Sequence, residues 1–163
     1  MDFQIDTADA LEISDLEISQ LLLRVYVDDG FVAPELAASL FEATAVRSRG
    51  KIIGARERQS LIFAGMVIIV YPTSPARRMA RGNETEMHLL GVNPEYRGKG
   101  LGKALVAAAI NDATQSGYSK MVLWTQATMQ AAQRLYASAG FIRVPGRDFC
   151  RGGRDFRVYE KVL

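Results

Sequence analysis

RGKGLGK, residues 97–103, is the stretch of this 163-residue sequence that decides most about its fold. It follows a strand-like apolar run at residues 87–92 and opens a helix-like run at residues 101–117. Glycines at a strand-to-helix turn let backbone N–H groups approach a ligand with no side chain in the way. Because unpaired N–H groups and the helix dipole both favour negative charge at a helix start, the stretch predicts a loop that binds a phosphate-type anion.

Two common phosphate-binding loops do not fit this stretch. A nucleotide-triphosphate loop needs a glycine where Asn93 stands and a Ser or Thr where Gly100 stands. The dinucleotide pattern G-x-G-x-x-G needs a glycine where Leu105 stands. Taken alone, the residues leave open a glycine-rich turn without a ligand.

Apolar periodicity and turn residues predict a chain of alternating strands and helices without internal repeats. A loop is expected over residues 72–83, which contain Pro72, Pro75 and Gly82. Thr128 is expected to cap the helix that follows it. The expected strands are 3–6, 51–56, 61–71, 84–92, 120–125, 142–144 and 156–163, and the expected helices are 15–27, 34–46, 101–116 and 129–139.

Composition indicates one α/β domain over residues 1–163. Hydrophobic residues make up 48% of the chain and the formal net charge is +2, so neither nucleic acid nor a membrane is expected as a partner. Cys150 is the only cysteine, which excludes an intramolecular disulfide. The acidic N-terminus lacks the apolar core of a signal peptide, and the expected location is cytoplasmic.

Two blocks of sequence resemble the GCN5-related N-acetyltransferase (GNAT) superfamily. Residues 86–102, EMHLLGVNPEYRGKGLG, are similar to its acetyl-CoA-binding segment, including the pattern [R/Q]-x-x-G-x-[G/A]. Residues 132–141, AQRLYASAGF, are similar to its A-x-x-L-Y-x-x-x-G-F helix. Both blocks stand in the family's order and spacing, and the resemblance covers residues 86–141.

The resemblance implies a mixed, mostly antiparallel sheet in which strand 84–92 splays from its parallel neighbour 120–125 at a bulge and holds acetyl-CoA. Backbone groups of Leu90 and Val92 are expected to pair with the pantetheine arm, and the glycine loop with the pyrophosphate. Met129 replaces an Asn that often begins the family's helix. No metal is expected. The implied cofactor-binding residues are Leu90, Gly91, Val92, Arg97, Gly98, Lys99, Gly100, Leu101, Gly102, Lys103 and Gln133.

The resemblance also implies transfer of an acetyl group from acetyl-CoA to a primary amine by direct attack in a ternary complex. Glu86 is the expected general base and Tyr136 the expected general acid, with His88 or a water as alternative bases. Strand alternation predicts that Glu86, His88, Leu90 and Val92 share one face. The helix position of Tyr136, in one stripe with Ala132 and Leu135, also fits a plain core tyrosine.

The acceptor is open: a small-molecule amine, a protein N-terminus or a lysine. Its pocket is expected among the early helices, the loop after residue 71 and the last strands, and a homodimer is possible. The alternatives to amine acetylation are a non-catalytic acyl-CoA sensor, transfer to a hydroxyl, and transfer of a longer acyl group. Candidate pocket residues are Tyr26, Phe31, Tyr71, Trp124 and the arginines within residues 147–154.

Overall fold

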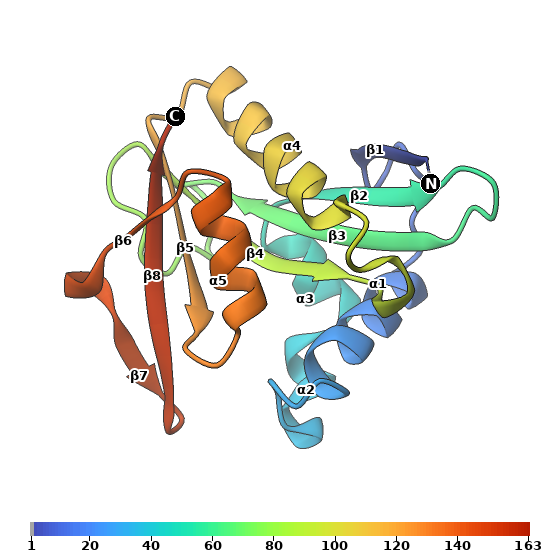
Figure 1. Cartoon of the computed structure of the whole chain (residues 1–163), viewed down its shortest axis with the longest axis horizontal. Coiled ribbons are helices and arrows are strands. Elements are labelled where there is room, and N and C mark those ends of the chain that lie inside the picture. Colours follow the sequence, from blue (N-terminus) through green and yellow to red (C-terminus); the bar gives the residue numbers. More distant parts are fainter. Residues whose placement is uncertain (1) are drawn as a thin grey trace.

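One eight-stranded sheet forms the centre of the molecule in the computed structural model, which describes residues 2–163 (Figure 1). The strand order is β1-β2-β3-β4-β5-β8-β6, and β7 pairs with β8. The pair β4–β5 is parallel and all other neighbours are antiparallel, which confirms the expected mixed sheet. The strands are β1 (Phe3–Thr7), β2 (Lys51–Glu57), β3 (Phe63–Val70), β4 (Glu84–Val92), β5 (Lys120–Gln126), β6 (Ile142–Arg143), β7 (Phe149–Arg151) and β8 (Arg154–Val162).

Helices cover both faces of the sheet (Figure 1). The long α4 and the shorter α5 pack on one face, and α1 to α3 pack on the other. The helices are α1 (Asp15–Leu22), which continues as a π-helical turn η1 (Leu23–Val27), α2 (Pro34–Leu40), α3 (Ala43–Ser48), α4 (Leu101–Gln115) and α5 (Gln130–Ser138). Two short 3-10 helices are η2 (Pro94–Tyr96) and η3 (Pro145–Arg147).

Three local predictions are wrong. The helix expected over residues 34–46 is two helices, because Phe41 turns into the core and Glu42 caps a new helix by accepting the N–H groups of Thr44 and Ala45. Thr128 does not cap α5, whose N-cap is Met129 with no side-chain hydrogen bond. The strand β7 was not expected; it pairs with β8 through a turn at residues 152–153, where both glycines have positive φ.

A bulge in β4 decides which side chains face which helices. In the pairing of β3 with β4, Met66 lies opposite Gly91 and Ile68 lies opposite His88. One residue of β3 separates the two pairs, but two residues of β4 do, so β4 carries one extra residue. Leu89 takes a φ of +48°, a left-handed conformation that is rare for a branched side chain. The extra residue bends the strand and reverses its alternation from that point.

The predicted shared face of Glu86, His88, Leu90 and Val92 is therefore wrong. Glu86 and His88 lie opposite Val70 and Ile68, which belong to the core under α1 to α3. Leu90 and Val92 pack against the other core, under α4 and α5. The bulge thus places the two titratable side chains on one face of β4 and the predicted cofactor-binding residues on the other.

The parallel pairing of β4 and β5 is short. It joins Glu84–Glu86 to Lys120–Val122 and then ends, while β5 remains paired with β8 as far as Gln126. The second half of β4 therefore has no neighbour on its β5 side. Unpaired ladder groups along such an opening are ready hydrogen-bond partners for a ligand.

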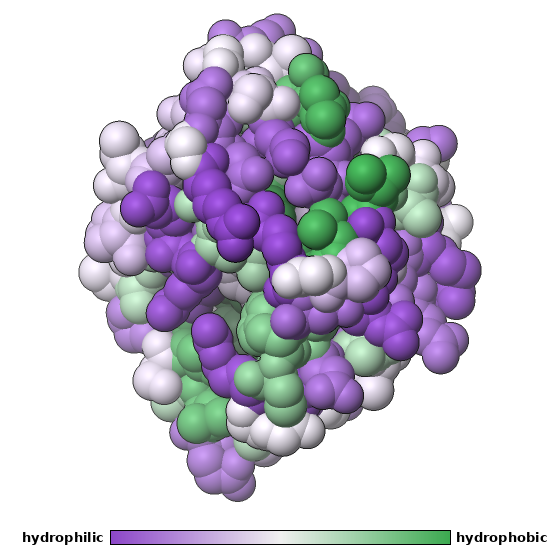
Figure 2. Space-filling model, turned by 90° about the vertical axis from the view of Figure 1, so that its left-hand side faces the viewer, coloured by the Kyte–Doolittle hydropathy of each residue, from purple (hydrophilic) through white to green (hydrophobic). Residues whose placement is uncertain are grey.

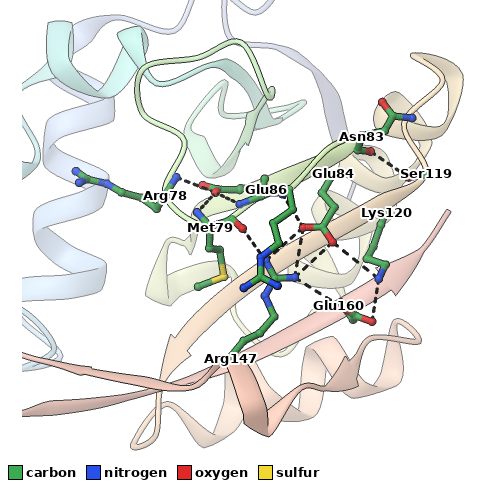
Figure 3. Close-up of polar contacts among 11 residues, drawn as sticks. Arg78, Met79, Asn83, Glu84, Glu86, Ser119, Lys120, Arg147 and Glu160 are labelled. Atoms are coloured by element: carbon green, nitrogen blue, oxygen red, sulfur yellow. Dashed lines mark hydrogen bonds and ion pairs between the residues drawn. The ribbon is translucent and has the colours of Figure 1, made fainter.

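An ion-pair cluster fixes the end at which β4 and β5 remain paired (Figure 3). Arg147 donates to the Glu84 carboxylate at 3.3 Å and lies 3.8 Å from Glu160. Lys120 contacts Glu160 at 3.1 Å and Glu84 at 3.8 Å. These residues come from β4, β5, β8 and η3, so the cluster joins four elements at the first of the three β4–β5 pairs.

The face that carries the C-terminal strands is mostly hydrophilic, with separate hydrophobic patches and a hollow near its centre (Figure 2). Ile142 of β6 and Val162 of β8 are exposed by 63% and 71%. Within residues 2–163, no helix has the length and apolar character needed to cross a membrane. The homodimer stays a prediction.

Replacing Arg147 by Met is expected to lower the free energy of unfolding by about 2 kcal/mol, because the two largely buried carboxylates of Glu84 and Glu160 then share Lys120 as their remaining cation. Urea unfolding followed by circular dichroism measures the change. Arg134→Met is the matched control, since Arg134 is exposed on α5, and a shift within about 0.5 kcal/mol is expected there. Equal stability of R147M and the unmodified chain would contradict the structural role of the cluster.

Candidate active site

Glu86 is fully buried at the last paired position of β4 (Figure 3). Its Oε1 accepts the backbone N–H groups of Arg78, Met79 and Ala80 at 2.8, 2.5 and 2.7 Å. Its Oε2 lies 2.6 Å from His88 Nε2. Burial by itself raises the pKa of this carboxyl, but the hydrogen bonds from His88 and the three amides outweigh burial and hold the pKa below its usual value.

His88 is a buried, neutral histidine with one free nitrogen. Burial lowers the pKa of its imidazole more than the neighbouring Glu86 carboxylate raises it. Since Glu86 is ionised, the 2.6 Å contact assigns the proton to Nε2, which leaves a lone pair on Nδ1. Nδ1 is the single buried side-chain nitrogen without a hydrogen-bond partner among residues 2–163. The Trp124 ring lies edge-on to the imidazole, with centroids 4.7 Å apart.

Tyr136 lies on α5, on the other face of the sheet. Its ring packs against Phe141 and Tyr159 at centroid distances of 6.0 and 6.2 Å, and it is 7% exposed. Burial raises the pKa of its phenol. No group within residues 2–163 forms a hydrogen bond with its hydroxyl, so this hydroxyl is available to a bound molecule.

Tyr26 joins the two faces at the opening. Its hydroxyl donates to the Leu90 carbonyl at 2.9 Å, so a backbone group predicted to bind pantetheine already has a partner. Burial raises the pKa of Tyr26, and the nearby phenol of Tyr136 raises it further. Tyr26 thus reaches the backbone of β4 from the α1 side, at the stretch that has no β5 neighbour.

The glycine loop has the geometry of an anion-binding turn. Gly98 and Gly100 have φ values of +73° and +80°, and a Cβ on either would meet only open space. Gly100 is the N-cap of α4, and no side chain caps the first N–H groups of that helix. Gly102 serves packing as well, because a Cβ there would lie 3.2 Å from Leu135 of α5.

Several predicted cofactor-binding side chains form contacts within the protein. Arg97 pairs with Asp29 at 2.8 Å and donates to the Val92 carbonyl at 3.2 Å. Lys99 donates to the Glu95 carbonyl at 2.9 Å. Gln133 ties α5 to the end of β5 by donating to the Ala127 carbonyl at 2.9 Å. The cofactor roles of these side chains stay predictions.

Aromatic side chains lead outward from His88. Trp124 of β5 meets Phe149 edge-on at 6.3 Å, and Phe149 stacks on Phe156 at 4.9 Å. The loop at Phe31 closes this side, because its carbonyl accepts hydrogen bonds from Gln126 at 2.7 Å and from Arg154. Phe31, Trp124 and Arg154, three of the predicted pocket residues, therefore lie in one region of the structure.

Two predicted pocket residues are engaged elsewhere. Tyr71 packs on the α4 face, where its hydroxyl donates to Asp112 at 2.7 Å and its ring stacks on Tyr118. Arg147 is held in the ion-pair cluster. Sequence reasoning missed the three loop amides that bind Glu86, since backbone N–H groups carry no residue-specific signal; the only hint is a turn-rich loop that precedes a strand-borne carboxylate.

Residues 2–163 contain no group of three or more His, Cys, Asp or Glu side chains arranged to hold a metal ion. Two surface hollows, of about 460 and 580 Å³, lie beside the β2–β3 turn and outside the β7–β8 hairpin. Neither hollow is lined by the Glu86–His88 pair or by Tyr136. The candidate site is thus the splay itself.

Comparison with known proteins places these features in a family. The sequence profile of the acetyltransferase (GNAT) family matches residues 16–141. A mycothiol acetyltransferase of Kocuria rhizophila is 47% identical over 58 residues, which are 36% of this chain and 19% of that protein. An N-acetylaspartate synthetase of Danio rerio is 44% identical over 62 residues, which are 38% of this chain and 22% of that protein. The matches thus span about a fifth of the length of these two relatives.

The fold is shared over the whole chain with solved structures. A Bacillus subtilis acetyltransferase in complex with CoA superimposes with a TM-score of 0.70 and 20% identity, covering 99% of each chain. At that identity the match shows the fold alone. The profile match, which includes both the glycine loop and Tyr136, shows more: the chain belongs to the acetyltransferase (GNAT) family.

Proposed function

We propose that this chain transfers an acetyl group from acetyl-CoA to a primary amine, by direct attack of the amine in a ternary complex. The observation that carries the proposal is the splay of β4 from β5, which lies between the free Tyr136 hydroxyl and the Glu86–His88 pair. Family membership and the resemblance of the two sequence blocks support the reaction type.

The residues present fit acetyl-CoA as the second substrate. The uncapped N–H groups at the start of α4, together with the open turn at Gly98 and Gly100, suit a pyrophosphate. The unpaired side of β4 suits the amides of the pantetheine arm. When bound, acetyl-CoA supplies the acetyl group as an activated thioester.

Tyr136 is the proposed donor to the leaving sulfur. As the C–N bond forms and the C–S bond breaks, negative charge develops on sulfur and a proton must reach it. A phenol near pKa 10 protonates a thiolate near pKa 8.5 only at a cost of about 2 kcal/mol. Burial raises the pKa of Tyr136 further, so its main contribution is a hydrogen bond that strengthens as the charge develops.

His88 is the better proton acceptor of the two buried groups on β4. An ordinary imidazole lies about four pKa units below an alkyl ammonium, whereas a carboxyl lies about six units below it, a difference of roughly 3 kcal/mol. Both Glu86 oxygens are already occupied, and Nδ1 of His88 is free. We therefore assign the amine proton to His88 and a positioning role to Glu86, which was the expected base.

A thiol-release assay with acetyl-CoA and a panel of amines tests the proposed function. We expect acetyl-CoA-dependent release with at least one class among amino acids, polyamines and peptides with free N-termini, and mass spectrometry should find the acetylated amine. Matched alcohols serve as controls. Binding of acetyl-CoA with no release for any acceptor would favour a non-catalytic sensor, while release with alcohols or with longer acyl-CoA donors would favour those reactions instead.

Tyr136→Phe is expected to lower kcat about 10- to 100-fold and to change the KM for acetyl-CoA less than twofold, because the hydroxyl acts on the developing charge. Steady-state thiol release measures both constants. Tyr118→Phe is the control, since that tyrosine stacks on Tyr71 away from the splay. Equal kcat values for Y136F and the unmodified chain would remove Tyr136 from the chemistry.

The single histidine of the chain gives a clean test of its protonation state. The unfolded chain binds a proton at His88 near pH 6.5, whereas the folded chain binds it only at a lower pH. The unfolded state therefore holds more protons in this interval, and stability falls as the pH drops below about 6.5, by at most about 1.4 kcal/mol per pH unit.

Urea unfolding between pH 5 and 7 measures this slope. His88→Gln should remove it, and the slope of the unmodified chain should be smaller at pH 7 than at pH 6, because the histidine of the unfolded chain is then mostly unprotonated. A slope of the same size in the His88→Gln protein would show that His88 is not held neutral in the fold.

A further inference from the structure

Two arginines beside the site have no carboxylate partner. Arg49 follows α3, is partly buried, and donates one hydrogen bond, to the Leu40 carbonyl at 3.3 Å. Arg78 lies in the loop between β3 and β4. No Asp or Glu within residues 2–163 forms an ion pair with either guanidinium, whereas Arg97, Arg143 and Arg147 all have acidic partners.

The loop between β3 and β4 is held so that Arg78 has a fixed position. The N–H groups of residues 78–80 bind Glu86, and the Met79 carbonyl accepts from Arg147 Nη2 at 2.6 Å. Ser74 of the same loop donates to the Arg49 carbonyl at 2.7 Å. The Arg78 side chain extends away from Glu86, toward the N-terminal helices (Figure 3). The tethered loop thus brings the two arginines to the same side.

The two guanidinium groups act on each other and on the site. The pKa of Arg49 is lowered, first by burial and then by the charge of Arg78. Both charges also lower the pKa of His88. Burial lowers this pKa most, and the Glu86 carboxylate raises it. Arg49 further influences Tyr26, whose hydroxyl reaches the opening at Leu90. The hydrogen bonds agree with these influences, because the backbone N–H of Arg78 binds Glu86, the partner of His88, and Ser74 of the same loop binds the Arg49 carbonyl.

Like charges repel each other, and an anion bound between them removes the repulsion. Arg49 is partly buried, whereas Arg78 is exposed and therefore accessible to a ligand. Guanidinium groups bind carboxylates with charge-assisted hydrogen bonds that are roughly twice as strong as neutral ones. We propose that Arg49 and Arg78 form a subsite for a carboxylate of the acceptor, so that the amine to be acetylated belongs to a molecule that also carries a carboxylate. This inference rests on the proposed function and names the substrate class of that site.

Matched substrates test the subsite. Amino acids and their α-carboxamides, each at constant ionic strength and saturating acetyl-CoA, are compared by thiol release. We expect kcat/KM to be at least tenfold higher for the acid than for the amide. Arg49→Gln and Arg78→Gln should each reduce this acid-to-amide ratio about tenfold or more. Arg77→Gln, which removes an exposed arginine next to Arg78, should keep the ratio.

A binding measurement covers the case in which a variant loses turnover. With CoA present, the acids should raise the melting temperature of the unmodified chain more than the amides do, and this difference should vanish in R49Q and R78Q. Amides that react as well as acids, or variants that keep the ratio, overturn the inference and leave amine acetylation standing. No acetylation of any amine, together with equal stabilisation by acids and amides, overturns both.

Discussion

The rest of the site depends on the short pairing between β4 and β5, which stops after three residue pairs. The ion-pair cluster around Arg147 and Glu84 stabilises the paired part of these two strands. Beyond Glu86 the strands part, and β5 stays with β8. A parallel pair that separates inside a sheet leaves backbone groups without ladder partners, and the proposed function places the bound molecules there, between Tyr136 on one face and His88 on the other.

The bulge at Leu89 complements the splay. Without the extra residue, Leu90 and Val92 would share a face with Glu86 and His88, under α1 to α3, and would not pack beneath α4 and α5. A left-handed backbone at a leucine costs free energy, of order 1 kcal/mol, which the packing of Leu89 against the core beneath α1 to α3 offsets. Strain at this position is thus linked to the placement of Glu86 and His88 on the opposite face of β4 from Leu90 and Val92.

The sequence was sufficient for the parts of the site that depend on residue type. Glycines at positions 98 and 100 predict the open turn before α4, and residues 132–141 predict the helix of Tyr136, as the structure confirms. The parts that depend on backbone geometry were not predictable. Nothing in a leucine signals positive φ, so alternation gave the wrong face for Leu90 and Val92. The sequence also gives no signal for the backbone amides that bind Glu86, and so it could not predict the position of Arg78.

Local charge connects the positioning of Glu86 with the acceptor chemistry. The charge of the Glu86 carboxylate is stabilised by hydrogen bonds from three amides and His88, which occupy both of its oxygens and leave none free to pair with an ammonium ion. Arg49 and Arg78 add two positive charges nearby. Positive charge lowers the pKa of a bound amine, as it lowers that of His88, and so raises the fraction of neutral, nucleophilic amine. A carboxylate on the acceptor supplies the attraction that the amine itself does not have, which makes binding and deprotonation compatible at one site.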